Sequence, residues 1–187
     1  MRRFELEHSA VLAAQLIAER FGKMGVLVVG SQSILGTWDE DELPPDATAS
    51  IEVDLVPLKE TPDESVSTLI DVFLGLDSEF HQEHGYYVHG VGANTSYLPA
   101  GWMDRLVPLR SVRSKAEVFC LDPHDLCVAK LMRFEPRDKR FVTSLVRAGL
   151  IQPETLIERI AGVDFGAMER PEVGPIALKW AKALRLR

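Results

Sequence analysis

Residues 50–56, Ser-Ile-Glu-Val-Asp-Leu-Val, alternate strictly between polar and apolar side chains. Successive side chains of a β-strand point to opposite faces, so this period of two predicts a strand with one polar and one apolar face. Ile51, Val53 and Leu55 are expected in the core, which leaves Glu52 and Asp54 together on the other face. Residues 26–29 are apolar at every position, which is typical of a central strand buried on both sides.

Helical patterns accompany these strands. Residues 5–22 predict an amphipathic helix that ends at Gly22, and shorter helices are expected at residues 32–35 and 67–74. Further strands are expected at residues 86–91, 96–98 and 116–121. The apolar residues at helical spacing, which should form the packed face of the first helix, are Phe4, Val11, Leu12, Leu16, Ile17 and Phe21.

From residue 122 onward the pattern predicts helices alone. Asp122 is a strong N-terminal cap before Pro123, and Asp125 completes a capping-box-like start for a helix to about residue 133. Glu135-Pro136 breaks this helix, and further helices are expected at residues 137–148, from 153, and at 176–186. The sequence therefore predicts an α/β (α+β) core at residues 1–121 and a helical part at 122–187, packed as a single compact unit.

Composition excludes several classes of protein. The 187 residues are 46% hydrophobic and 26% charged, which is typical of a globular protein and not of a disordered, collagen-like or coiled-coil chain. No apolar run reaches the roughly 18 residues that a membrane helix needs, and the N-terminus turns acidic too early for a signal peptide. We expect a cytoplasmic protein without a membrane partner, in which Cys120 and Cys127 are buried, reduced thiols.

The balance of charge argues against non-specific nucleic-acid binding. The chain has 21 Lys and Arg residues against 28 Asp and Glu, a net charge of −7. An acidic protein repels a polyanion, although a local basic site remains compatible with this composition.

Gly30-Ser31, at the end of the apolar strand, and the pair Glu52 and Asp54 form the first candidate site. Side chains two residues apart on a strand point the same way with Cα atoms about 6.6 Å apart, so both carboxylates can converge on one hard cation such as Mg²⁺. Gly30 allows close approach of a ligand, and the Ser31 hydroxyl and following amides can receive phosphate oxygens. The alternative interpretation is a simple turn and an exposed strand face.

Lys130 and Asp138 form the second candidate site. Lys130 stands among apolar neighbours, so its ammonium either reaches solvent or has an anionic partner, such as a phosphate or the two acids Glu52 and Asp54. Asp138 is interpreted either as a catalytic or metal-binding acid or as a partner of the helix dipole.

Two weaker metal interpretations concern other residues. Glu117, on a later predicted strand, is a candidate third metal carboxylate. His81, His84 and His89 are interpreted as surface or turn histidines in preference to a transition-metal cluster.

Taken together, these segments resemble the nucleotidyltransferase-fold proteins related to AbiEii toxins, within the polymerase-β-like superfamily. The resemblance covers about residues 5–160, and the Gly-Ser turn and acid-x-acid pair are shared across the superfamily. The segments that carry it are residues 30–36, 50–54, 80–81, 85–87, 98–102, 105–107, 124–126 and 130–131 with Asp138.

This resemblance implies a nucleotidyltransferase core with a mixed sheet, followed by C-terminal helices. It implies transfer of a nucleoside monophosphate from a nucleoside triphosphate with release of pyrophosphate. The roles that it assigns are Mg²⁺ (or Mn²⁺) binding to Glu52 and Asp54, triphosphate binding to Gly30 and Ser31, phosphate binding to Lys130, and catalytic assistance by Asp138.

Two positions depart from the family pattern. Glu52 stands where aspartate is commoner, and Glu135-Pro136 stands where related proteins tend to carry a basic residue. Arg133 or Arg137 is a candidate replacement for that missing charge.

Two functions follow as alternatives. The first is an enzyme that modifies a hydroxyl of an RNA, a protein or a small molecule. One version of this function is the toxin of a toxin–antitoxin pair, which would have an antitoxin as its partner. The second is a non-catalytic nucleotide-binding or protein-interaction module on the same fold.

Overall fold

A computed structural model describes residues 1–92, 96–109 and 116–185. One mixed five-stranded sheet has the order β3-β2-β1-β5-β4. β1 pairs antiparallel with β2 and parallel with β5, β2 pairs parallel with β3, and β4 pairs antiparallel with β5. The strands are β1 (Val26–Val29), β2 (Glu52–Pro57), β3 (Tyr87–Gly90), β4 (Val107–Pro108) and β5 (Val118–Cys120). The predicted mixed α/β class is confirmed.

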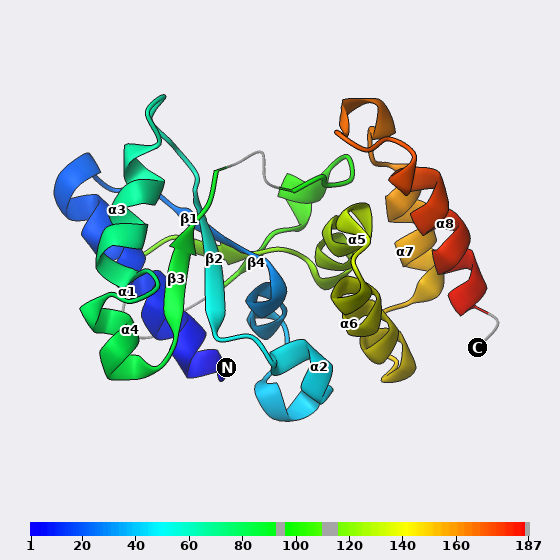
Figure 1. The fold of residues 1–187 in the computed structure, drawn as a ribbon, viewed down its shortest axis with the longest axis horizontal. Coiled ribbons are helices and arrows are strands. Elements are labelled where there is room, and N and C mark those ends of the chain that lie inside the picture. Colours follow the sequence, from blue (N-terminus) through cyan, green and yellow to red (C-terminus); the bar gives the residue numbers. More distant parts are fainter. Residues whose placement is uncertain (93–95, 110–115, 186–187) are drawn as a thin grey trace.

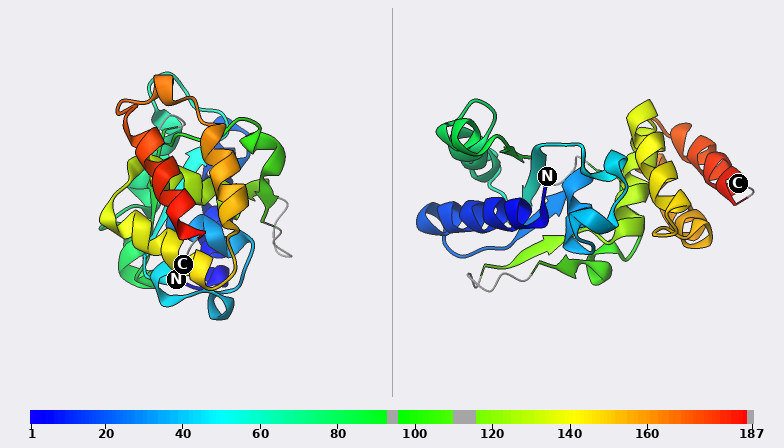
Figure 2. Two further views of the ribbon diagram at one scale, coloured as in Figure 1. Left: turned by 90° about the vertical axis from the view of Figure 1, so that its right-hand side faces the viewer. Right: turned by 90° about the horizontal axis from the view of Figure 1, so that it is seen from below.

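The helices gather at two sides of this sheet. Figure 1 shows α1, α3 and α4 beside the strands at one end, and α5 to α8 together at the other end. Figure 2 shows the same arrangement from the side and from below, with α8 far from α1. The α-helices are α1 (Arg3–Phe21), α2 (Pro45–Thr48), α3 (Ser65–Leu74), α4 (Glu79–His84), α5 (Pro123–Arg133), α6 (Pro136–Arg147), α7 (Pro153–Ala161) and α8 (Val173–Leu184).

Short 3₁₀ helices connect several of these elements. They are η1 (Ser31–Gly36), η2 (Glu40–Glu42), η3 (Trp102–Arg105) and η4 (Phe165–Ala167). None of the helices in the described ranges is long and apolar enough to cross a membrane.

The strand patterns are largely confirmed. All four residues of β1 are buried, and in β2 the side chains of Val53 and Leu55 are fully buried whereas Glu52 and Asp54 are half-buried. Ile51 was wrongly predicted as a core residue: it precedes the strand and is 49% exposed. The alternation of burial therefore begins with β2 itself and runs from Glu52 to Leu55.

The packed face of α1 agrees with the prediction only in part: Ile17 is fully buried, and Leu12 and Leu16 pack against the core. Phe4 is 56% exposed and Phe21 is 37% exposed, whereas the buried positions are Leu6, Ser9, Ala10, Ala13, Ala14 and Ile17. Small alanine and serine side chains allow the helix axis to approach its neighbours closely. Phe4 and Phe21 were therefore wrongly predicted to belong to the packed face.

Other local predictions also needed correction. Residues 96–98 form no strand, and the prediction missed the short strand β4 and helix α4. The last helix begins at Val173 and not at residue 176, and Ile176 is exposed. Residue 186, the predicted end of that helix, lies outside the described residues. Cys120 and Cys127 are free and buried, and burial raises the pKa of each thiol to about 12.

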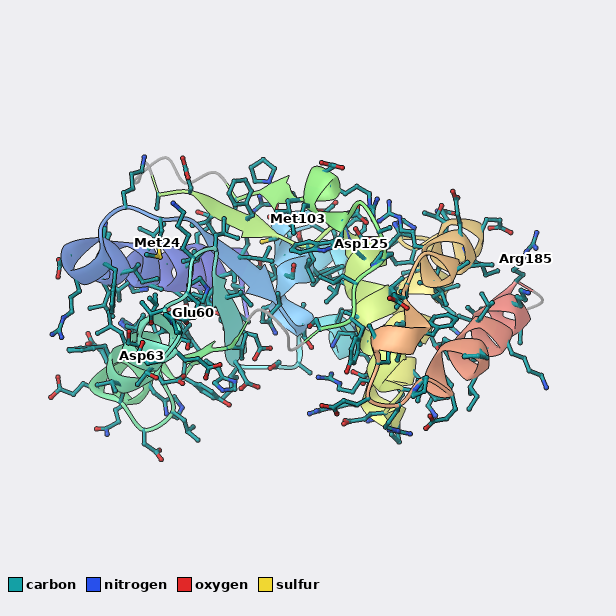
Figure 3. All side chains as sticks on the ribbon, turned by 90° about the horizontal axis from the view of Figure 1, so that it is seen from above. Met24, Glu60, Asp63, Met103, Asp125 and Arg185 are labelled. Atoms are coloured by element: carbon teal, nitrogen blue, oxygen red, sulfur yellow. The ribbon has the colours of Figure 1, made fainter. Side chains whose placement is uncertain are left out.

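The start of α5 is fixed by charged groups. Asp122 caps the helix by accepting from the backbone N–H of His124 and of Asp125, and it also pairs with Arg159 of α7. Asp125 does not complete a capping box, because its buried carboxylate pairs with Arg105 at 2.8 Å and with Arg159 at 3.0 Å. Figure 3 labels Asp125 near the middle of the molecule, between the sheet and the outer helices. These pairs join η3, α5 and α7.

Asp122→Asn should lower the free energy of unfolding by about 1–2 kcal/mol near neutral pH, because asparagine still caps the helix but loses the charge that pairs with Arg159. Burial alone would raise the pKa of Asp122, but its hydrogen bonds with His124 and the charge of Arg159 lower it to about 2 from 3.8. The contribution of the Asp122 charge to the free energy of unfolding is therefore complete above about pH 4, and it is lost as the pH falls toward about 2.

Denaturant unfolding of both proteins across this pH range measures the difference. Asp41→Asn, at an exposed acid, is the control. An equal loss of unfolding free energy in Asp41→Asn would contradict a specific role for the Asp122 charge. So would a difference between wild type and Asp122→Asn that persists at the lowest pH.

Candidate functional site

A cavity of about 610 Å³ lies where the ends of β1 and β2 meet α5 and α6. Its volume is within the usual range for small-molecule sites. All six of the predicted site residues line it, and they are Gly30, Ser31, Glu52, Asp54, Lys130 and Asp138. The structure thus brings both candidate sites of the sequence into one cavity.

The acidic side of this cavity comes from β2 and β3. Glu52 and Asp54 share the face that the alternation predicted, and His89 of β3 lies beside them. In the parallel register His89 is the partner of Asp54, and its Nδ1 is 3.4 Å from Glu52 Oε1 and 3.5 Å from Asp54 Oδ1. Ligand atoms of all three residues lie within 4.8 Å of one another.

These groups have the chemistry of a divalent-cation site. Burial raises the pKa of the Asp54 carboxyl, and the charge of Glu52 raises it further, against the opposing effect of His89. Two acids that repel one another in a partly buried place are stabilised by a shared cation. The residues present therefore fit the ion that the resemblance implies.

Gly30 brings the chain close to Asp54. It ends β1 with φ 65° and ψ −167°, a conformation that is essentially restricted to glycine. A Cβ at this position would overlap the Asp54 carboxylate. Gly30 therefore allows both the turn after β1 and the close approach of the Asp54 carboxylate to the backbone.

The opposite side of the cavity carries cations. Lys130, on α5, is 6% exposed, and its ammonium donates to Ser31 Oγ at 2.9 Å and lies 3.7 Å from Asp138 Oδ1. It also lies 4.3 Å from the centre of the Phe141 ring. Burial lowers the pKa of Lys130, and the charge of Asp138 opposes this effect. Lys130 lines the same cavity as Glu52 and Asp54, but its direct partners are Ser31 and Asp138 and not those two acids.

Asp138 organises this basic side. Its buried carboxylate accepts from Arg133 Nε at 2.9 Å and from Arg133 Nη2 at 2.6 Å, and from the backbone N–H of Glu135. Burial alone would raise the pKa of Asp138, but the hydrogen bonds and charge of Arg133 and the charge of Lys130 lower it. Asp138 is therefore an ionised anchor for two cations.

This chain has Glu135 where related proteins tend to carry a basic residue, but other basic residues line the cavity. Arg133, Arg137 and Arg140 all line the cavity, whereas Glu135 caps α6 and pairs with Arg137 at 2.9 Å. Both proposed replacements, Arg133 and Arg137, are thus in place. Arg140 was not predicted as a site residue, although its spacing from Arg137 along one helix was a usable signal.

The other metal candidates lie elsewhere. The backbone carbonyl of Glu117 accepts from Val26 N–H at the start of β1, so Glu117 is at the far end of that strand from Gly30 and was wrongly proposed as a ligand. His81 accepts from the backbone of Asp77, and the His84 ring packs on Phe80. His89 was missed because its place depends on strand pairing.

A smaller cavity of about 180 Å³ adjoins the first. Gly30, Ser96, Lys130 and Arg133 line both, whereas Leu126, Met132 and Met168 make the smaller one more apolar. The larger cavity is therefore lined mainly by charged groups and the smaller one is less polar, and Lys130 lines both.

The mixed sheet presents two carboxylates on one side of the cavity, and α5 and α6 present basic side chains on the other. Such an arrangement has the chemistry to bind a metal ion together with an anionic ligand. The chain belongs to the family described as nucleotidyltransferase of unknown function (DUF6036), which matches residues 9–183. No curated protein and no solved structure gives a significant match. The family assignment agrees with the predicted nucleotidyltransferase class.

Gly30→Ala should destabilise the protein by about 2–3 kcal/mol, because it combines a strained backbone with displacement of Asp54. Gly85→Ala is the matched control: Gly85 also has a positive φ of 75°, but nothing lies within 4 Å of the added Cβ. Urea denaturation followed by circular dichroism measures both. Equal losses would show that Asp54 does not depend on Gly30.

Proposed function

We propose that this protein is a nucleotidyltransferase that depends on a divalent ion, Mg²⁺ or Mn²⁺, and moves a nucleoside monophosphate from a nucleoside triphosphate to a hydroxyl group. The observation that carries the proposal is the division of the cavity, with Glu52 and Asp54 on one side and Lys130 and three arginines on the other. A metal-bound triphosphate needs both, since carboxylates hold the ion and cations neutralise the phosphates.

Each side of the cavity has a distinct task in this proposal. Glu52 and Asp54 hold the ion, while Ser31 and Lys130 contact phosphate oxygens at the end of β1. Arg133, Arg137 and Arg140 surround the remaining negative charge. The adjoining apolar cavity has the character needed for a nucleobase or for the body of the acceptor.

In the reaction, the acceptor hydroxyl attacks the α-phosphorus and loses its proton to solvent water, while the bond from that phosphorus to the bridging oxygen breaks and pyrophosphate leaves. Glu52 and Asp54 would hold a divalent ion here, which would supply stabilisation of the negative charge that develops on oxygen. Lys130 and Arg133 stabilise the negative charge that accumulates on pyrophosphate.

Asp138 supports these cations in the proposal. With its pKa lowered and both oxygens paired, it is poorly suited to accept a proton. Its contribution to catalysis is therefore to orient Lys130 and Arg133.

A narrower version of the proposal is that the protein is related to AbiEii-type toxins and acts as a toxin with an antitoxin partner. It is supported by the resemblance of the segments around residues 80–87, 98–107 and 124–131. An RNA end, a protein and a small molecule are the acceptors to compare.

The direct test is to incubate the purified protein with each α-labelled nucleoside triphosphate, Mg²⁺ and one acceptor class at a time. Transfer of label with release of pyrophosphate supports the enzyme. Saturable nucleotide binding without transfer to any acceptor would support the non-catalytic nucleotide-binding alternative instead.

Asp54→Ala should abolish Mg²⁺-dependent stabilisation by nucleotide while the protein stays folded, because it removes a metal ligand and relieves repulsion from Glu52. A ligand at about 100 times its Kd adds about 2.7 kcal/mol of stability, so the loss is visible as a change in Tm. Thermal denaturation with and without Mg²⁺ and nucleotide provides the measurement. Glu158→Ala, an exposed acid of α7, should respond like the wild type; a full response in Asp54→Ala would remove Asp54 from the site.

Lys130→Met should weaken triphosphate binding about tenfold or more, because one desolvated charged contact contributes about 1.5–3 kcal/mol. Methionine retains the apolar stem, and Arg133 still pairs with Asp138. Lys139→Met is a matched control, since Lys139 also lies over an aromatic ring, that of Phe134 at 4.5 Å, but does not line the cavity. Calorimetric titration compares the variants, and unchanged affinity in Lys130→Met would exclude a phosphate contact.

A further inference from the structure

We propose that His89 is the third protein ligand of the metal site, and that the site therefore favours Mn²⁺ over Mg²⁺. The inference rests on the proposed function, in which Glu52 and Asp54 hold a divalent ion. It adds a residue to that site and assigns a preference between two ions.

The spacing of the donor atoms supports direct ligation. His89 Nδ1 lies 3.4 Å from Glu52 Oε1 and 3.5 Å from Asp54 Oδ1. Neighbouring ligand atoms at about 2.1–2.2 Å from one ion are themselves about 3.0–3.6 Å apart in octahedral or tetrahedral geometry. The three side chains therefore already have the separations of ligands that share an ion.

Strand pairing holds His89 in this place. Its neighbour Val88 is fully buried on the opposite face, and Asp54 is its direct partner across the parallel ladder. The next residue, Gly90, donates its N–H to Asp71 of α3 at 2.8 Å. The imidazole thus stands on an anchored strand whose other face is in the core, which is the support that a metal ligand needs.

The composition of the donor set determines the preference. Among the residues that the structure describes, the group that joins Glu52 and Asp54 in ligand range is an imidazole and not a third carboxylate. Mg²⁺ prefers oxygen donors and near-ideal octahedral geometry. First-row transition ions accept imidazole nitrogen together with carboxylates, and Mn²⁺ also retains the affinity for phosphate oxygens that nucleotide chemistry requires.

A competing explanation is that His89 acts only as a positive charge that offsets the two acids. In that case the histidine would leave the coordination shell when an ion binds. The two explanations differ in one observable: only a ligand transfers electron spin from bound Mn²⁺ to its nitrogen.

The first experiment titrates the full-length protein with Mn²⁺ and follows free Mn²⁺ by electron paramagnetic resonance, with Mg²⁺ as competitor and without nucleotide. We expect one site that prefers Mn²⁺. His89→Asp should still bind a divalent ion through three carboxylates, but its preference for Mn²⁺ over Mg²⁺ should fall about tenfold. His84→Asp, at an exposed histidine of α4, should leave the preference unchanged.

Folding of the variants is verified by their thermal transitions. The His89 side chain is 49% exposed, so the substitution removes little packing. The added carboxylate should lower the Tm of His89→Asp without metal, and Mg²⁺ should restore it, because the three acids repel one another until an ion binds.

The second experiment records electron spin echo modulation of bound Mn²⁺. Coupling to a directly bonded imidazole nitrogen in the wild type, absent in His89→Asp and present in His84→Asp, supports the inference. Mn²⁺ binding without nitrogen coupling, or an unchanged ion preference in His89→Asp, would overturn it and leave the Glu52 and Asp54 site intact. Absence of divalent binding to the wild type, even with nucleotide, would overturn both this inference and the proposed function.

Discussion

The register between β1 and β2 is the constraint on which the cavity depends. It pairs Val29 with Asp54, so that the turn at Gly30 and the acidic pair meet at one end of the sheet. A slip of one residue would turn the acids into the core and expose Val53 and Leu55. Each of these fully buried apolar side chains contributes about 1.5–3 kcal/mol, so core packing enforces the orientation of the charged residues.

The buried carboxylate of Asp138 contributes to the geometry of the cavity more than to the stability of the fold. Removing Asp138 and Lys130 from water costs several kcal/mol each, and their attraction repays little more than that cost. The benefit is geometric, since Asp138 fixes Arg133 through two parallel hydrogen bonds and keeps Lys130 near Ser31. A cation held in place before the ligand arrives loses less conformational entropy on binding.

Features determined by local sequence could be predicted, and features determined by pairing could not. The apolar run of β1, the alternation of β2 and the cap at Asp122 depend on neighbouring residues, and the structure contains all three. His89 acquires its place only through the parallel ladder with β2, which leaves no trace in a single segment. Glu117 looked equivalent to other strand acids, but the direction of β5 puts it at the wrong end of the sheet. In α1 the packed face combines Leu6 and Ile17 with small alanine and serine side chains, so residue size identified only part of it.

The distribution of charge limits what the proposed enzyme can accept as a substrate. The chain has a net charge of −7, yet Lys130, Arg133, Arg137 and Arg140 line one cavity. At physiological salt, charges interact over about 8 Å, so a small metal-bound triphosphate inside the cavity is attracted by this local basic wall. A long polyanion that extends beyond the cavity would instead be repelled by the net negative charge of the chain. In the proposed function, this difference would disfavour an acceptor hydroxyl within a long RNA relative to one on a protein, a small molecule or an RNA end.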